Sequence, residues 1–386
     1  MKNTNLLCLC VLFAAFVASL PANAQEDAAN AQEDAANAQE DAAKPIEMLK
    51  WSELHSLPNE LGVAGPFAGV HNDCLIVAGG ANFPQPIWES EKKWYETIHV
   101  LQKQGDHYDW FDGGKLPRAT GYGAAVSTKQ GVVCIGGNNA NEPFADVYLL
   151  SCDREKKQLT TTDYPSLPKP VAFSSAALAG DVIYLAGGQS GQSLDSAMNQ
   201  FWSLDLSRRG NDDFQWQELD PLPGPTRAFH LTIHQRNGND DCIYVISGRR
   251  QRRERTEFLK DNWEYNISKK TWRRRADVPQ CVMAGTGIGI DRSRIFVLGG
   301  ADGTNFHIGA SIKDQHPGFP KKSFAYHTIS DTWIESGTTP ANHVTTIAVK
   351  WGEQIVIPSG EIKPKVRSPK IWSVKAEQLP PSRRNG

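Results

Sequence analysis

Six short apolar runs recur along the chain, and each ends in a glycine that follows another small residue. The runs read LIVAGG, VVCIGG, IYLAGG, IYVISG, IFVLGG and IVIPSG, and their last glycines are Gly80, Gly137, Gly188, Gly248, Gly300 and Gly360. Successive glycines are therefore 57, 51, 60, 52 and 60 residues apart. A period of this length indicates a repeat architecture, in which each unit buries its apolar faces only against its neighbours.

A second feature has the same period: a tryptophan followed by a proline seven positions later. The five pairs are Trp51 and Pro58, Trp110 and Pro117, Trp216 and Pro223, Trp272 and Pro279, and Trp333 and Pro340. In the remaining unit Leu159 and Pro168 take these places. Each unit holds four short β-like runs without the 3.6-residue periodicity of a helix, which disfavours a helical solenoid.

The two ends of the repeat region complement each other. The segment from Trp51 to Pro58 has the character of a fourth strand with no strands before it. The last unit, residues 342–375, has three strand-like runs and no Trp-to-Pro ending. An N-terminal strand that completes the last sheet would close a ring and remove both open sheet edges. We therefore predict an all-β fold over residues 47–386, a six-bladed β-propeller closed by its N-terminal strand.

Residues 1–24 have the pattern of a secretory signal peptide. Lys2 precedes an apolar run of 15 residues, 6–20, and an Ala-Asn-Ala cleavage site ends at Ala24. The following residues, 25–46, carry AQEDAAN heptads with six carboxylates, which predicts a disordered acidic spacer, with a helical stalk as the alternative. We expect an exported protein, periplasmic or secreted.

Charge and cysteine content exclude several classes of protein. Residues 45–386 hold 39 Lys and Arg against 37 Asp and Glu, a balance without the basic footprint of a nucleic-acid partner. Apart from the N-terminal run, no stretch reaches 18 apolar residues, so no membrane span is expected. Five cysteines remain after the signal peptide, an odd and widely spaced set that is not a disulfide framework. Whether any two of them pair stays open.

The blade geometry selects a set of candidate site residues beside the central channel. The residue after each glycine pair and the turn after each Trp-to-Pro segment lie at the same end of a sheet. The residues after the glycines are Ala81, Asn138, Gln189, Arg249, Ala301 and Glu361, and the turns contribute Arg118, Arg227, Asn342 and His343. Glu361 is the one carboxylate among the residues after the glycines, so it is the first candidate for acid–base catalysis.

The groups around Glu361 on this rim suit a polar, anionic, sugar-sized ligand. Arg118 and Arg227 are candidates for binding a carboxylate, because a guanidinium presents paired donors; the alternative for each is an ion pair between blades. Asn138, Gln189, Asn342 and His343 are candidates by position alone. The arginine run from Arg249 to Arg255 is interpreted as a solvated or salt-bridged loop rather than a polyanion site, with only Arg249 near the rim.

The paired glycines and the Trp-x₆-Pro endings resemble kelch repeats. More narrowly, the segments VAGPFAGVHNDCLIVAGGANF, LPRATGYGAAV, PTRAF and SGEIKPKVR resemble the N-acetylneuraminate (sialic acid) mutarotases, also called epimerases, over nearly all of residues 51–375. Because the V-A-G-x-F-A-G blade leads here, the chain is similar to the cyclically permuted branch. The resemblance implies cofactor-free interconversion of the α and β anomers of sialic acid, with no metal and with Glu361 as proton acceptor. Lys363 and Arg367 lie in the same motif and are candidates to anchor the ligand or to keep Glu361 ionised.

Other functions remain as alternatives. A non-catalytic kelch ring that binds glycans or an exported protein is the second hypothesis, since fold does not fix function, although a lone carboxylate among cations argues against it. A hydrolase or copper oxidase is disfavoured, because the sequence has no S-x-D-x-G-x-T-W box and no assembled Tyr/His/Cys set. Another 2-keto acid sugar as substrate stays open, and the sequence gives no oligomeric state.

Overall fold

The computed structural model describes residues 48–105 and 107–376. The predicted signal peptide, 1–24, and the predicted acidic spacer, 25–46, lie outside these residues. Within the described residues, no helix is both long and apolar enough to cross a membrane.

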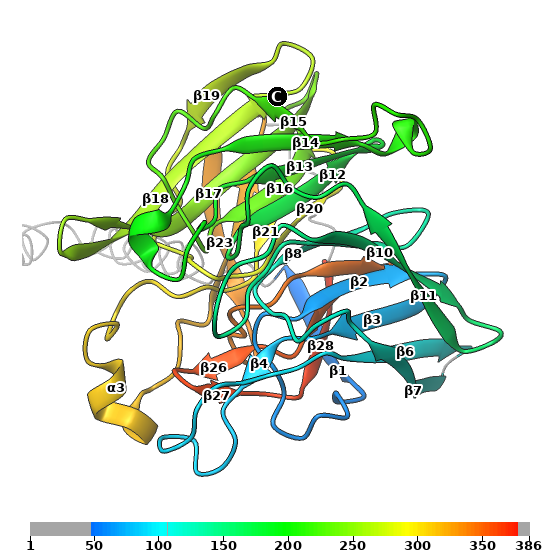
Figure 1. The fold of residues 1–386 in the computed structure, drawn as a ribbon. Coiled ribbons are helices and arrows are strands. Elements are labelled where there is room, and N and C mark those ends of the chain that lie inside the picture. Colours follow the sequence, from blue (N-terminus) through cyan, green and yellow to red (C-terminus); the bar gives the residue numbers. More distant parts are fainter. Residues whose placement is uncertain (1–47, 106, 377–386) are drawn as a thin grey trace, which may run out of the picture. The chain divides into compact units, whose positions relative to one another are not determined.

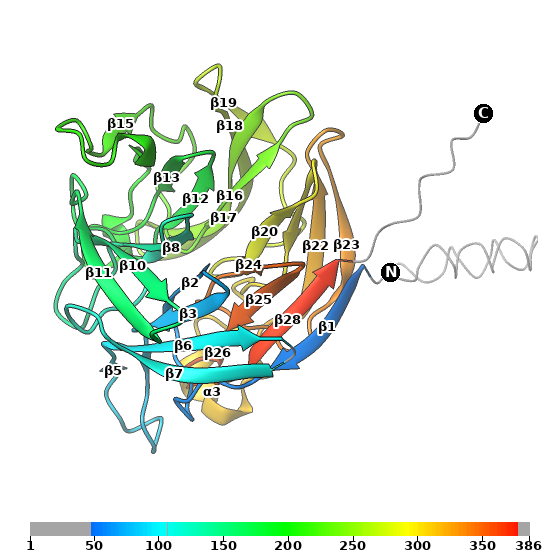
Figure 2. The same ribbon diagram turned by 90° about the vertical axis from the view of Figure 1, so that its right-hand side faces the viewer.

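The described chain forms six four-stranded antiparallel sheets. Figures 1 and 2 show the sheets arranged around a common axis, with one strand of each sheet toward the middle and one at the outside. Five of the sheets are built from strands that follow one another along the chain, and the sixth joins strands from the two ends of the described unit. This arrangement is the predicted six-bladed β-propeller.

The strands of each blade run from the channel outward. Blades 1 to 3 comprise β2 (Phe67–His71), β3 (Cys74–Ala78), β6 (Thr97–Gln104) and β7 (His107–Lys115); β8 (Ala124–Ser127), β9 (Val132–Ile135), β10 (Val147–Asp153) and β11 (Gln158–Tyr164); and β12 (Ser175–Ala179), β13 (Val182–Ala186), β14 (Phe201–Asp205) and β15 (Gln217–Leu219). Blades 4 to 6 comprise β16 (Leu231–Arg236), β17 (Asp241–Arg252), β18 (Arg255–Asn266) and β19 (Thr271–Arg275); β20 (Gly287–Ile290), β21 (Arg294–Val297), β22 (Lys322–His327) and β23 (Thr332–Thr338); and β24 (Val349–Trp351), β25 (Gln354–Pro358), β28 (Ile371–Ala376) and β1 (Leu49–Leu54).

The ring is closed by its N-terminal strand, as predicted. β1 pairs antiparallel with β28, so that Leu49 lies opposite Ala376 and Leu54 opposite Ile371. The chain therefore enters and leaves the propeller side by side. β1 occupies the outer edge of blade 6 and satisfies the backbone groups that β28 would otherwise expose.

The hydrophobic core is divided among the interfaces between neighbouring blades. Between blades 1 and 2, for example, Phe67 and Ile76 pack with Val132 and Cys134, all at most 1% exposed. Similar clusters fill the other five interfaces. The five cysteines of the described part are buried free thiols.

Three of the repeated tryptophans also connect blades through hydrogen bonds. The indole Nε1 of Trp216 donates to the backbone carbonyl of Pro165 at 3.0 Å. The indole Nε1 of Trp272 donates to the backbone carbonyl of Asp220 at 3.0 Å. Trp333 donates in the same way to Ala276 at 2.9 Å. Each partner lies just after the outer strand of the preceding blade. The Trp-to-Pro segment therefore fixes the outer edges of adjacent blades to one another.

A closed ring of six backbone hydrogen bonds encircles the channel, one from each blade. Its members are Gly65, Tyr122, Phe173, Phe229, Ala284 and Thr345. The N–H of each residue donates to the carbonyl of its counterpart in the preceding blade at 2.6–2.9 Å, and Gly65 donates to Thr345 to complete the circle. All six have φ between 53° and 65°, a left-handed conformation that costs a non-glycine residue about 1 kcal/mol. The interblade hydrogen bonds offset that cost.

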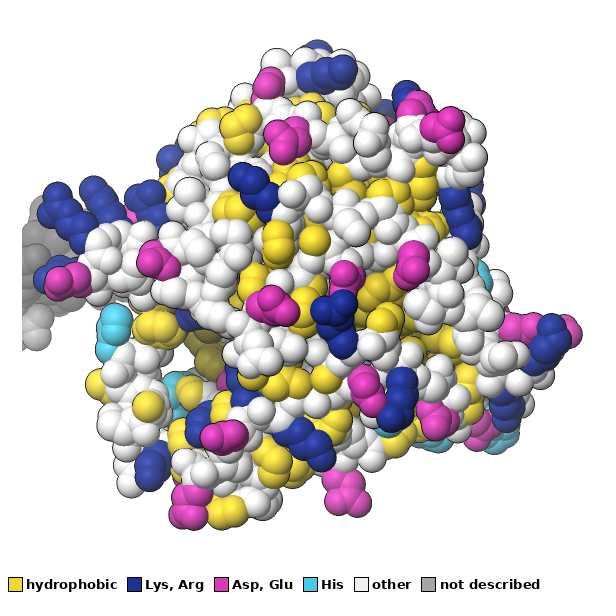
Figure 3. Space-filling view, viewed as in Figure 1, with side chains coloured by type: hydrophobic (Ala, Val, Ile, Leu, Met, Phe, Trp, Pro, Cys, Tyr) yellow, Lys and Arg dark blue, Asp and Glu magenta, His cyan; other side chains and the backbone are white. Residues whose placement is uncertain are grey.

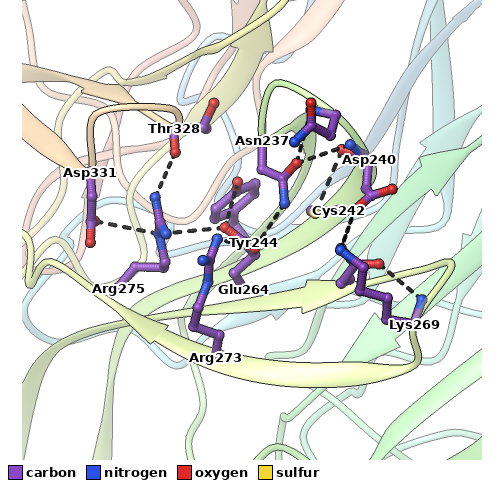
Figure 4. A network of polar contacts seen from close by, with 12 residues as sticks. Asn237, Asp240, Cys242, Tyr244, Glu264, Lys269, Arg273, Arg275, Thr328 and Asp331 are labelled. Carbon is purple, nitrogen blue, oxygen red and sulfur yellow. Dashed lines mark hydrogen bonds and ion pairs between the residues drawn. The ribbon is translucent and has the colours of Figure 1, made fainter.

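A polar network joins blades 4 and 5 around the buried carboxylate of Glu264 (Figure 4). Glu264 accepts hydrogen bonds from the Tyr244 hydroxyl at 3.0 Å and from Arg273 at 2.8 Å. The Nε of Arg275 lies 3.4 Å from Glu264 and donates to the Tyr326 hydroxyl of blade 5 at 2.9 Å. This network fixes the two blades in register.

Several short elements were not predicted. Two small ladders, β4 (Ala81–Asn82) with β5 (Lys93–Trp94) and β26 (Glu361–Lys363) with β27 (Val366–Arg367), lie in loops, with the helix α3 (Gly309–Ile312) and the 3₁₀ turns η1 (Leu194–Ser196), η2 (Leu206–Arg208) and η3 (Lys313–Gln315). The arginine run predicted as a loop is instead the end of the β17–β18 hairpin, whose pairing continues past a bulge between Ile246 and Gly248 to Arg252 and Arg255. Figure 3 shows basic side chains gathered at its tip.

Candidate active site

The backbone places the residues after the glycine pairs on one rim. Each of them forms an antiparallel β-bridge with the residue just before a member of the hydrogen-bond ring. The six bridges are Ala81 with Ala64, Asn138 with Gly121, Gln189 with Ala172, Arg249 with Ala228, Ala301 with Met283, and Glu361 with Val344. Equivalent positions of all six blades therefore present their side chains around the channel mouth, as the blade geometry predicts.

The motif SGEIKPKVR folds into a tight hairpin that places Arg367 opposite Glu361. β26 pairs with β27 so that these two residues are cross-strand neighbours. Lys365 has φ of 67° directly after Pro364, the combination that a type II turn requires. The spacing of the motif is thus set by the length of the turn.

Glu361 is a partly buried carboxylate with one oxygen fixed by the protein. Its Oε1 accepts hydrogen bonds from the Lys365 backbone N–H at 2.8 Å and from Arg367 at 3.1 Å. Oε2 has no hydrogen-bond partner within residues 48–105 and 107–376. The side chain is 17% exposed. One oxygen is therefore oriented while the other remains available to a ligand.

Arg367, the cross-strand neighbour of Glu361, is held in place by several contacts. Its side chain is 3% exposed, its Nε donates to the Ala81 carbonyl at 3.3 Å, and its guanidinium lies 4.8 Å from the centre of the Phe83 ring. Burial lowers the pKa of Arg367, but the charge of Glu361 and the hydroxyl of Tyr122 act in the opposite direction, and the net pKa is raised. The Arg367 guanidinium therefore places a fixed positive charge beside the Glu361 carboxylate.

A cavity of about 230 Å³ opens in front of Glu361. It spans blades 4 to 6, with Arg249 on one side, Glu361 on the other and Ala301 between them. Blade 5 contributes the small side chains Ala284 and Ala301 to the cavity wall, between the blades that carry the two charged groups. Figure 3 shows a hollow bordered by hydrophobic side chains between the β17–β18 hairpin and the region of α3.

The outer wall of the cavity is the loop 301–320, which carries α3. Asn342 holds both ends of this loop, since its side chain exchanges hydrogen bonds with the backbone of Gly300 and donates to the carbonyl of Pro320. Lys363 donates to the carbonyl of Asp314 at 3.3 Å, and Trp88 donates to the Asp314 carboxylate at 2.9 Å. Asn342 and Lys363, both predicted as ligand-binding residues, thus serve here to position this loop.

Two residues to which the sequence analysis assigned no ligand-binding role line the cavity. Arg249 lies in the arginine run, and only its position after Gly248 distinguishes it from its neighbours. His316 lies in the irregular loop and has no sequence pattern that marks it. Its Nδ1 accepts the Gly318 N–H at 3.0 Å, so the neutral ring carries its proton on Nε2. Burial and the charge of Lys363 lower the pKa of His316, with Glu361 opposing them, which favours a neutral ring at pH 7.

Arg118 and Arg227 do not line this cavity. Arg118 is 50% exposed, pairs with Asp146 at 3.1 Å and stacks on Phe144. Arg227 is fully buried and forms a two-pronged ion pair with Asp261 at 2.9 and 2.7 Å, with a further hydrogen bond to the Ser247 carbonyl. Both guanidinium groups thus have acidic partners within the protein, the alternative that the sequence left open.

The remaining rim candidates also lie outside the cavity wall. Asn138 and Gln189 are buried on blades 2 and 3, where both approach Gln192. His343 is buried in blade 6, where its Nε2 accepts the Trp372 indole N–H at 3.3 Å. The structure therefore brings together Glu361, Arg367 and Lys363, and adds Arg249 and His316. In the described part of the chain, no group of three or more His, Cys, Asp or Glu side chains could hold a metal ion.

The family model described as the KLHDC2/KLHL20/DRC7 Kelch-repeats domain matches residues 65–300, more than half of the chain. The chain belongs to this Kelch-repeat family. The solved structure called "Structure of YjhT" superposes with a TM-score of 0.60 at 14% identity, covering 81% of this chain and 94% of that one, which shows the same fold.

Curated relatives of this kelch chain are named N-acetylneuraminate epimerase. That of Haemophilus influenzae (strain PittEE) is 25% identical over 231 residues, and that of Pasteurella multocida (strain Pm70) is 24% identical over 231 residues. Each match covers 53% of this chain and 57% of the relative. A shorter match, to the protein of Yersinia pestis (strain Pestoides F), is 34% identical over 88 residues, 20% of this chain and 21% of the relative. The chain thus spans about half the length of the first two relatives, and less of the third.

Proposed function

We propose that this protein accelerates the interconversion of the α and β anomers of N-acetylneuraminic acid. The observation that carries the proposal is the carboxylate of Glu361, which has one oxygen fixed by Lys365 and Arg367 and lines a cavity that also holds a cation. The names of the curated relatives support the substrate class. We further propose that residues 1–24 direct export, so that the enzyme acts in the periplasm or outside the cell and supports sialic acid uptake or catabolism.

The reaction needs one group that both removes and returns a proton. Glu361 takes the proton of the anomeric hydroxyl as the bond between the anomeric carbon and the ring oxygen breaks, and the ring oxygen receives a proton from Glu361 or from water. The open keto form rotates about the bond next to its carbonyl and recloses on the other face. The proton count is unchanged at the end. Positioned acid–base catalysis of this kind contributes roughly 10²–10⁴-fold.

The surroundings of Glu361 suit both halves of this proton cycle. Arg367 places a positive charge beside the carboxylate that acts as the base, and the Lys365 N–H fixes its orientation. The cavity is smaller than the roughly 300 Å³ at which pockets for whole drug-sized ligands begin, so it would enclose the reacting end of the sugar and leave the rest toward solvent. His316, neutral and protonated on Nε2, is a further donor in the same cavity.

The test is proton NMR of α-N-acetylneuraminic acid freshly released from a glycoside. The wild-type protein should shorten the approach to anomeric equilibrium, and Glu361→Gln should remove roughly 10²-fold or more of that acceleration, because an amide cannot accept the anomeric proton. The matched control is Glu353→Gln, which removes an exposed carboxylate from a turn of the same blade and should leave the rate unchanged. Melting temperatures would establish that both variants are folded.

Two results would contradict the proposal. An unchanged rate in folded Glu361→Gln would remove Glu361 from its role. A wild-type protein that binds sialic acid in calorimetry, yet leaves the spontaneous rate of equilibration unaltered, would identify a binding ring instead of an isomerase.

A further inference from the structure

Arg249, which is partly buried, differs from the buried arginines of the protein. Arg227, Arg275 and Arg367, each at most 8% exposed, all lie within 3.4 Å of a carboxylate oxygen. Arg249 forms no ion pair with any described residue, and its buried Nε has no hydrogen-bond acceptor there. A partly buried cation without an anion loses hydration that no partner replaces, so a protein retains one where something else supplies the negative charge.

The guanidinium of Arg249 is nevertheless held in place. It lies 4.2 Å from the centre of the Phe229 ring and 5.0 Å from that of Phe306, so two aromatic rings position it. The backbone N–H and carbonyl of Arg249 exchange two hydrogen bonds of 3.0 Å with those of Ala228. Burial lowers the pKa of Arg249 to about 10, with the charge of Glu361 acting in the opposite direction, so the group stays protonated near neutral pH.

The position of Arg249 relative to Glu361 matches the chemistry of a 2-keto acid sugar. In such a sugar the anomeric carbon carries both the hydroxyl that must lose its proton and the carboxylate. Arg249 and Glu361 line the same cavity from blades 4 and 6, separated by the methyl group of Ala301. An anomeric carbon placed over Ala301 would therefore direct its hydroxyl to Glu361 and its carboxylate to Arg249.

We propose that Arg249 is the residue that binds the substrate carboxylate and thereby selects sugar acids over neutral sugars. This inference rests on the proposed function and assigns its specificity to one side chain. The other guanidinium beside the site, Arg367, already serves Glu361, the Ala81 carbonyl and the Tyr122 hydroxyl. Of these two guanidinium groups, Arg249 is therefore the one whose donors have no acceptor among the described residues. A guanidinium can hold a carboxylate through two parallel hydrogen bonds, which a single ammonium cannot.

The experiment compares N-acetylneuraminic acid with its carboxyl methyl ester in the NMR assay. Arg249→Gln should raise KM for the free acid by ~10–100-fold, the loss expected for a charged hydrogen-bonded contact, and should leave the methyl ester unaffected. Arg249→Lys should fall between the two, since it keeps the charge but loses the paired donors. The matched control is Arg252→Gln, which removes an exposed arginine from the same strand and should behave as wild type.

A second measurement separates failure of this inference from failure of the proposed function. Calorimetry with an unsaturated sialic acid analogue that lacks the anomeric hydroxyl reports carboxylate binding without any reaction. If the wild-type protein accelerates equilibration and Arg249→Gln matches it on both substrates and binds the analogue equally well, Arg249 has no role. If the wild-type protein does not accelerate equilibration, the proposed function is wrong. In that case, loss of analogue binding in folded Arg249→Gln would still support the role of Arg249 in carboxylate binding. Equal binding by the variant and the wild type would overturn that role.

Discussion

Arg227 follows a Trp-to-Pro segment and Arg249 follows a glycine pair, and the surroundings of the two arginines are opposite. Arg227 makes four hydrogen bonds, to Asp261, Ser247 and Pro225, whereas Arg249 faces a cavity. The sequence identified Arg227 as a carboxylate-binding candidate and placed Arg249 near the rim without a ligand-binding role. Asp261 is 34 positions from Arg227 in the chain, and only the pairing of β17 with β18 brings it near. Residue type predicts the chemistry of such a rim, and tertiary packing decides which residue performs it.

Buried histidines make the stability of the protein sensitive to acid. Burial lowers the pKa of His230 to about 3 and that of His343 to about 4, so both are neutral in the folded state. In the unfolded chain a histidine becomes protonated below about pH 6.5. In the folded protein the same histidine stays neutral until the pH reaches its own, lower pKa. The unfolded state therefore binds more protons between these values. Each histidine should cost about 1.4 kcal/mol of stability per pH unit as the pH falls from 6.5 toward 4.

Urea denaturation at pH 6.5 and pH 5 checks this expectation. The variant His343→Asn keeps an acceptor for the Trp372 indole but cannot titrate, so its free energy of unfolding should fall less than that of the wild type by about 2 kcal/mol over this interval. Equal losses in the two proteins would show that His343 does not contribute.

At the level of strands and loops, the repeat pattern predicted the main elements and missed the short ones. Each blade follows from an apolar run, a glycine pair and a Trp-to-Pro segment, because these recur with the sheet itself. The hairpin of β26 and β27 and the loop with α3 occur once each and have no such pattern. They are fixed by single contacts, such as those of Asn342 with the backbone at both ends of the loop 301–320. The cavity could not be predicted for this reason, since these elements form its wall.

The network around Glu264 shows how two blades are joined by charge rather than by apolar packing (Figure 4). Glu264→Gln should lower the free energy of unfolding by about 3 kcal/mol, because it leaves the buried Arg275 with less compensating charge. The control is Glu335→Gln, which breaks an exposed ion pair with Lys322 and should cost less than about 1 kcal/mol. Similar losses in the two variants, measured by urea denaturation, would contradict a special role for the network.

For the molecule as a whole, closure depends on a strand that is remote in sequence from the blade it completes. Deleting residues 1–46 removes no described residue and should leave the melting temperature unchanged. Deleting residues 1–55 removes β1 together with the buried Met48 and Leu49, a loss of about 3–6 kcal/mol in apolar burial alone, and exposes the edge of β28. We expect this second variant to self-associate or to fail to fold.

Size-exclusion chromatography and thermal denaturation would compare the two deletions. A 1–55 deletion that stays monomeric and melts like the 1–46 deletion would show that the remaining five blades and three strands hold the ring without β1. The rotated order of blades relative to the better-known mutarotases remains a prediction of the sequence resemblance.

The circle of backbone hydrogen bonds around the channel has a consequence for where such a chain can start. Every blade gives one N–H and one carbonyl to that circle, and the bond between Gly65 and Thr345 is equivalent to the other five. Leu49 and Ala376 meet in one sheet, so a short linker could join them while the polypeptide is cut open between any other pair of blades. Such a relinked chain would regain the same circle and the same rim. The beginning of the gene can migrate around the propeller during evolution while Glu361 and Arg249 keep their relation in space.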